Sequence, residues 1–122
     1  MKSDDTEARI DEAISKHETR NAALMRVFVE KGIDLSEARL IECHFWARDA
    51  RGAADMEQAL AMRGFKILNK RPSTSPRDAS LWKVEAGIQQ SINLTAHRGF
   101  TDELVRLAFV HSCEYDGWGC SV

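Results

Sequence analysis

Apolar side chains recur at helical spacing along the first quarter of the chain. They share one face of a predicted helix over residues 5–31: Ile10, Ile14, Leu24 and Phe28. His17 and Asn21 fall on the same face and interrupt it with polar groups. The pattern therefore predicts a long amphipathic helix whose apolar stripe contains two polar positions.

Three later segments alternate between apolar and polar residues at the period of a strand. In residues 40–46, one face carries Ile41, Cys43 and Phe45, and the other carries Glu42, His44 and Trp46. Residues 81–92 alternate in the same way, and residues 65–69 form a shorter predicted strand. Because the second face of residues 40–46 is half polar, we expect a sheet with one side exposed to water.

Two further helices are predicted over residues 53–63 and 101–111, and a last strand over residues 113–118. Thr101 is the expected N-cap of the second of these helices, and a start near Thr95 is the alternative. Residues 70–80 contain both prolines of the chain. They predict a polar loop in which no strand continues.

The order of these elements is a helix followed by β-α-β-β-α-β, the split βαβ arrangement of ferredoxin-like folds. We predict an α+β, ferredoxin-like βαββαβ sandwich with an extra N-terminal helix. It forms a single domain over residues 1–122 with its core over 38–119. In this topology the first strand lies between the third and the last, and helices cover one face of the sheet. We expect the N-terminal helix to cover part of the other face.

The composition excludes several classes of protein. The 122 residues, 43% of them hydrophobic, suffice for one domain with a core. A net charge of −2 provides no general attraction to nucleic acids or membrane surfaces. No apolar run approaches the roughly 20 residues of a membrane-spanning helix. The polar, acidic N-terminus is unlike a signal peptide, and three cysteines without a CxxC pair indicate free thiols. We expect a cytoplasmic protein that does not contact a membrane.

Two pairs of residues have the side chains of zinc ligands, Cys43-His44 and His111-x-Cys113. Cys43 and His44 point to opposite faces of a regular strand, so they cannot bind one ion together. A catalytic thiol at Cys113 would have two acids beside it, the wrong charge to favour a thiolate. The chain contains no hydrolase, kinase or phosphate-loop motif. We predict no catalytic residue, no metal site and no cofactor.

Direct RNA binding is an alternative function. Residues 63–77 contain several basic residues and no acid: Arg63, Lys66, Lys70, Arg71 and Arg77. Trp46, Tyr115 and Trp118 would add ring surface to an open sheet, as in sheets that stack RNA bases on aromatic side chains. The chain lacks the aromatic-rich strand consensus of such domains. A small enzyme on the same scaffold is the less favoured alternative.

The chain ends on a segment rich in aromatic, acidic and glycine residues. Residues 114–119 are Glu-Tyr-Asp-Gly-Trp-Gly, with a glycine on each side of the tryptophan. This segment resembles the terminal signature of the RraB family, the regulators of ribonuclease E activity B. Residues 41–44, Ile-Glu-Cys-His, resemble a second stretch of that family. The order of elements is similar over nearly the whole chain.

The resemblance implies a ferredoxin-like fold, no catalysis and no cofactor. It also implies a protein that binds ribonuclease E and modulates RNA processing and decay, with RNA involved only indirectly. The best-known members look strongly acidic, whereas this chain has a net charge of −2.

The resemblance assigns no contact residues, so the candidates for partner binding come from the predicted strands. They are Glu42, His44 and Trp46 on the polar sheet face, and Tyr115, Asp116 and Trp118 on the closing strand. The exposed sheet face with Trp46 is also where we expect a homodimer to form.

Overall fold

The computed structural model describes residues 2–74 and 80–121. Its elements follow in the order α1 (Lys2–Glu30), β1 (Ala38–Ala47), α2 (Ala50–Met62), β2 (Lys66–Pro72), β3 (Trp82–Ser91), α3 (Ile92–Ala96), α4 (Arg98–Val110) and β4 (Cys113–Gly119). Apart from the short α3, this is the predicted helix followed by β-α-β-β-α-β. The predicted α+β, ferredoxin-like fold is confirmed.

The four strands form one antiparallel sheet in the order β2-β3-β1-β4. β1 lies between β3 and β4, as predicted. Its register pairs His44 with Glu85 and Trp46 with Lys83 on β3. On the other side, Trp46 also pairs with Glu114 of β4.

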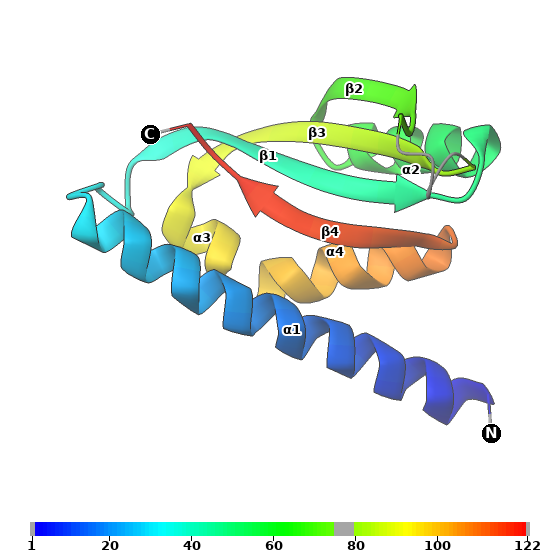
Figure 1. Cartoon of the computed structure of the whole chain (residues 1–122), viewed down its shortest axis with the longest axis horizontal. Coiled ribbons are helices and arrows are strands. Elements are labelled where there is room, and N and C mark those ends of the chain that lie inside the picture. The colour runs from blue at the N-terminus through cyan, green and yellow to red at the C-terminus, as the bar shows by residue number, and fades with distance from the viewer. Residues whose placement is uncertain (1, 75–79, 122) are drawn as a thin grey trace.

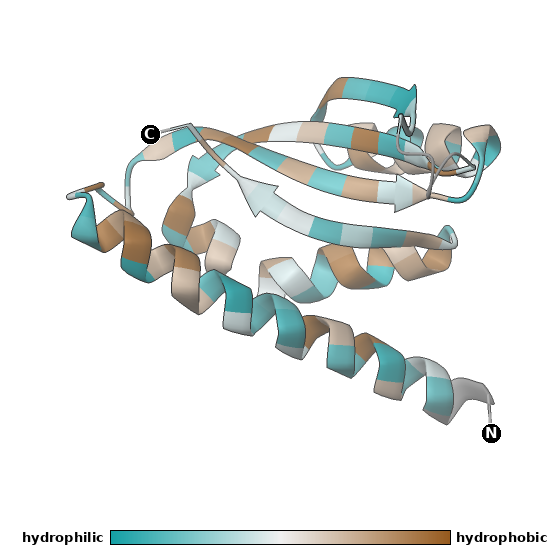
Figure 2. Ribbon diagram, in the orientation of Figure 1, coloured by the Kyte–Doolittle hydropathy of each residue, from teal (hydrophilic) through white to brown (hydrophobic). Residues whose placement is uncertain are grey.

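The core lies between one face of the sheet and the helices. Its fully buried side chains come from both layers: Ile14 of α1, Ile41 and Phe45 of β1, Met56 and Leu60 of α2, Val84 of β3, Ile92 of α3 and Leu104 of α4. Each such side chain contributes about 1.5–3 kcal/mol when it leaves water. Figure 2 shows apolar and polar residues alternating along β1 and β3. Because successive side chains of a strand point to opposite faces, the apolar residues gather on the face that packs against the helices.

α1 lies within this helical layer, and the prediction that it covers the other face of the sheet is wrong. It packs against α4 and α3, and it runs along the length of the molecule beneath β4 (Figure 1). Ile10, Ile14 and Phe28 of α1 are buried in the same core as the other helices. Because all four helices contribute to that core, none of the described helices lies over the opposite face. We call this opposite face, which carries Glu42, His44 and Trp46 of β1, the open face.

β2 continues to Pro72, so the prediction that no strand extends into residues 70–80 is wrong at its start. Proline is tolerated there because β2 is an edge strand, and a backbone N–H on its outer side has no strand to pair with. Residues 75–79 of the predicted loop, including Pro76 and Arg77, lie outside the described residues.

The helices after β3 also begin differently from the main prediction. Ser91 caps α3 by accepting a hydrogen bond at Oγ from the Leu94 N–H (3.1 Å). His97 caps α4 by accepting a bond at Nδ1 from the Gly99 N–H (3.0 Å). Thr101 is therefore not the N-cap; it is a buried residue inside α4. The predicted alternative start near Thr95 is closer to what the structure has.

Candidate functional site

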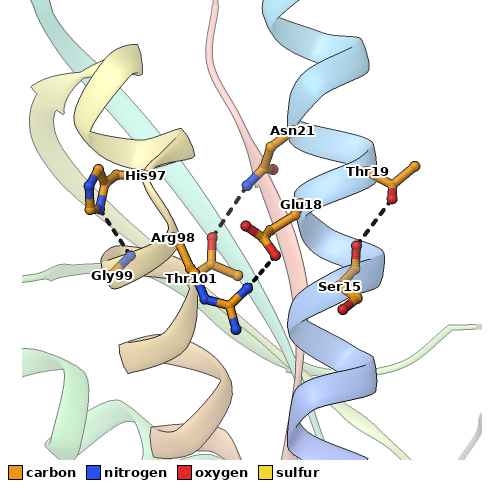
Figure 3. A network of polar contacts seen from close by, with 8 residues as sticks. All are labelled: Ser15, Glu18, Thr19, Asn21, His97, Arg98, Gly99 and Thr101. Atoms are coloured by element: carbon orange, nitrogen blue, oxygen red, sulfur yellow. Dashed lines mark hydrogen bonds and ion pairs between the residues drawn. The ribbon is translucent and has the colours of Figure 1, made fainter.

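Trp118 of the terminal segment is buried, with 2% of its surface exposed. Its indole Nε1 donates a hydrogen bond to Oδ1 of Asn21 in α1 (2.8 Å). Asn21 in turn donates through Nδ2 to Oγ1 of Thr101 in α4 (3.3 Å), as Figure 3 shows. The indole also stacks on Phe28 of α1 at 6.1 Å between ring centroids. The polar interruption at Asn21 thus supplies the partner that a buried indole N–H requires.

Tyr115 is buried on the same side of β4. Its ring lies 5.2 Å from Phe45 and 4.7 Å from His17, measured between centroids. His17 donates through Nε2 to the backbone carbonyl of Tyr115 (3.0 Å). The Tyr115 hydroxyl lies in the core beside the Cys43 thiol, and burial raises the pKa of the phenol well above its ordinary value.

Asp116 and Gly117 form an irregularity in the pairing of β4 with β1, where the register shifts between His44 and Phe45. Gly117 has a φ of 110°, a backbone region that side chains with a Cβ rarely occupy. Arg20 of α1 donates through Nη1 to the Asp116 carbonyl (2.7 Å). A Cβ on Gly117 would lie 1.8 Å from that same Nη1. The backbone conformation therefore favours glycine here, and a Cβ would also force the exposed Arg20 guanidinium to move.

These contacts join residues that lie far apart in the chain. We call them together the α1–β4 contact; its members are His17, Arg20, Asn21 and Phe28 of α1, and Tyr115, Asp116, Gly117 and Trp118 of β4. Beside it, Glu18 of α1 pairs with Arg98 of α4 at 2.5 Å (Figure 3). The sequence prediction missed His17, Arg20 and Asn21 as partners of the terminal segment. The signal available for two of them was their position within an apolar stripe.

The structure divides the six predicted partner-binding residues between two environments. Tyr115 and Trp118 face the core, and of the predicted rim only Asp116 has an exposed side chain. Glu42, His44 and Trp46 lie together on the open face, each partly buried.

An ionic cluster occupies the middle of the open face. His44 Nδ1 lies 3.3 Å from Glu85 Oε2 across the β1–β3 pair. The other carboxylate oxygen of Glu85 accepts from Asn69 Nδ2 (3.3 Å) and lies 3.7 Å from Arg71 Nη2, both on β2. The cluster thus links three strands across the sheet.

Apolar and aromatic groups lie on either side of this cluster. Lys83 Nζ lies 5.5 Å from the centroid of the Trp46 ring, a cation–π arrangement. Leu40 and Leu68 lie over Gly87, where an added Cβ would be 2.9 Å from Leu40 Cδ1. Both leucines are more than a third exposed. The open face therefore combines ring, aliphatic and charged surface.

The described residues include one group of three side chains with the ligand types and spacing for a metal ion. The ligand atoms of Glu42, His44 and Glu85 all lie within 4.8 Å of one another. The other candidate set is not brought together, because Cys43 is buried in the core while His44 lies on the open face. Burial raises the pKa of the Cys43 thiol to about 12, so this sulfur stays protonated at neutral pH.

The basic residues considered for RNA binding do not form one patch. Lys70 pairs with Glu57 of α2 in the helical layer (3.4 Å), whereas Arg71 pairs with Glu85 on the open face (3.7 Å). Arg63, at the end of α2, lies 3.9 Å from a carboxylate oxygen of α4. These positive charges are therefore already balanced by nearby acids.

A groove of about 620 Å³ lies between α1 and the start of β4. Trp46 contributes to its wall, but Glu42, His44 and Glu85 do not line it. The group formed by Glu42, His44 and Glu85 thus lies outside this groove.

Comparison with known proteins adds one match. A family model described as RraB, regulator of ribonuclease activity B, matches residues 18–120. The matched range contains both segments, 41–44 and 114–119, on which the sequence resemblance rests. A search of curated proteins finds no match. None of the helices within residues 2–74 and 80–121 has the length and apolar character needed to cross a bilayer.

Gly117→Ala tests the α1–β4 contact directly. We expect it to lower the free energy of unfolding by at least about 1–3 kcal/mol, because alanine is strained at this φ and its methyl group would displace Arg20. Gly119→Ala is the matched control, since Gly119 has no atom within 4 Å of an added Cβ and its φ is not positive. Urea unfolding followed by circular dichroism measures both variants. Equal stability of the two would contradict the assignment.

The same contact predicts a pH dependence of stability. Burial lowers the pKa of His17, and the hydrogen bond to Tyr115 opposes this only in part. The neutral imidazole is therefore favoured in the folded state. Its stability contribution is fully present above the unfolded pKa of about 6.5 and is lost as pH falls from there through the folded-state pKa.

We expect the free energy of unfolding to decrease between pH 7 and pH 5, and His17→Gln to show a weaker decrease over this range. Urea titrations at several pH values measure the effect. His111→Gln leaves the α1–β4 contact intact and serves as the control. An unchanged pH profile in His17→Gln would rule out His17 as its source.

Proposed function

Because the chain belongs to the RraB family, whose members are non-enzymatic regulators of ribonuclease activity, we propose that it regulates ribonuclease E by binding it through the open face. Family membership supports the regulatory role. The proposal adds the direct contact and the surface that makes it. The observation that carries the choice of surface is the position of α1, which leaves the open face without a covering helix among the described residues.

The chemistry of the open face is suited to a protein partner. Protein interfaces are enriched in aromatic residues and arginine, and their energy is concentrated in a few side chains surrounded by less important contacts. Trp46 with Lys83 forms one such centre, and Leu40 with Leu68 forms an aliphatic one. The His44–Glu85–Arg71 cluster between them presents paired charges to a partner.

The terminal segment has a different role in this proposal. Tyr115 and Trp118 are in the core, so their rings act by fixing β4 against α1. Asp116 is left as an exposed carboxylate on the edge strand, and in this proposal it contacts the partner at the border of the open face. Substitution of the two buried rings would weaken binding only through loss of folded protein.

Trp46→Ala tests the proposed surface. We expect the affinity for purified ribonuclease E to fall at least about tenfold, because a tryptophan at an interface centre is typically worth 2 kcal/mol or more. Isothermal titration calorimetry after nuclease treatment measures protein binding without an RNA bridge. Circular dichroism checks that the variant is folded.

Met62→Ala is the control, because Met62 is 79% exposed on α2, in the helical layer. We expect it to leave the affinity unchanged. If Met62→Ala binds ribonuclease E more weakly and Trp46→Ala binds it as tightly as the unchanged protein does, the interface lies on the helices and the proposed surface is wrong. The homodimer remains a prediction. Light scattering of the free protein measures its mass and so shows whether a second copy occupies the open face.

A further inference from the structure

We propose that Glu42, His44 and Glu85 bind a divalent transition-metal ion, with Zn²⁺ as the best fit, on the open face. The inference rests on the geometry of these side chains and does not depend on ribonuclease E binding. The three ligand atoms would be one imidazole nitrogen and two carboxylate oxygens. Zinc sites with three protein ligands use atoms of these kinds and leave the fourth position to water or another ligand.

The spacing of the ligand atoms is already near that of a bound ion. Tetrahedral zinc, with bonds of about 2.0–2.2 Å, holds its ligand atoms about 3.3–3.5 Å apart. His44 Nδ1 and Glu85 Oε2 are 3.3 Å apart, and the Glu42 oxygen completes a group whose members all lie within 4.8 Å.

The backbone holds the three ligands on a rigid support. His44 and Glu85 are directly opposed in the β1–β3 pair, and Glu42 lies two residues before His44 on the same face of the central strand. Glu42 is opposed by Gly87, which places no side chain between the ligands. Ligands on paired central strands are more rigidly placed than ligands on loops.

The two carboxylate oxygens of Glu85 have separate partners, as is common for carboxylates that bind metal ions in proteins. Asn69 Nδ2 and Arg71 hold Oε1, which leaves Oε2 directed at His44. Hydrogen bonds of this kind orient a ligating carboxylate and are commonly required for affinity. Arg71 balances one of the two negative charges of Glu42 and Glu85.

The side chains of this three-residue group are only partly exposed to solvent. The side chains of His44 and Glu85 are 23% and 16% exposed, and Nδ1 of His44 is buried without a hydrogen bond of good geometry. Lower exposure to water strengthens the attraction between a cation and the two carboxylates. The unsatisfied nitrogen is the atom to which a metal ion would bind.

The test is a Zn²⁺ titration of the full chain, freed of any polyhistidine tag, by isothermal titration calorimetry. We expect one ion per chain. His44→Ala and Glu85→Gln should abolish binding, and Asn69→Ala should weaken it by about 10- to 100-fold, the usual effect of losing a residue that orients a ligand. Glu114→Gln is the matched control: this acid is exposed and opposes Trp46 on the edge strand.

Cysteine binding is tested in parallel with Co²⁺, which gives a thiolate charge-transfer band in the near ultraviolet when sulfur ligates. We expect no such band and unchanged Zn²⁺ affinity in Cys120→Ser, the variant of the partly exposed cysteine. Circular dichroism of the metal-free variants verifies that each is folded. No Zn²⁺ binding, binding that survives in folded Glu85→Gln, or binding lost in Cys120→Ser would overturn the proposal.

Discussion

The docking of α1 on β4 through the buried Trp118 indole is the constraint on which the rest of the structure depends. The indole N–H donates to Asn21, and a buried donor left without a partner would cost about 1–3 kcal/mol. Arg20 donates to the Asp116 carbonyl through an Nη1 that lies where a Cβ on Gly117 would be. These requirements hold the N-terminal helix in the same layer as α3 and α4, although α1 precedes the ferredoxin-like core in the chain.

The position of α1 determines which surface remains for function. Every helix within residues 2–74 and 80–121 lies on one side of the sheet, and the opposite face of β1 and β3 retains its polar and aromatic side chains in contact with solvent. The family signature at the chain end therefore acts in folding, and the surface that it leaves free is the better candidate for a partner. The same surface holds the His44–Glu85 pair, whose geometry led to the metal proposal.

The alternation of apolar and polar residues was sufficient to predict the strands that have one face in the core and the other in water. The alternation in residues 40–46 correctly predicted that Ile41, Cys43 and Phe45 are buried. It could not show that β2 is an edge strand able to end in Pro72. The α1–β4 contact was hidden for another reason: Asn21 and Trp118 are 97 positions apart, and local composition does not distinguish a core ring from a surface ring. The family resemblance rests on two contiguous segments, 41–44 and 114–119, which can be recognised without the fold, and the family match confirms it.

The central claim is that Trp118 belongs to the core and Trp46 to the binding surface. The chain has three tryptophans, and each gives its own indole N–H signal in a nitrogen–proton correlation spectrum. The most direct measurement is a titration of the labelled protein with unlabelled ribonuclease E fragments, with the signals assigned by single substitutions. The account predicts that the Trp46 indole signal shifts or broadens selectively while Trp118 keeps its position. A selective change at Trp118 with Trp46 unaffected would contradict it.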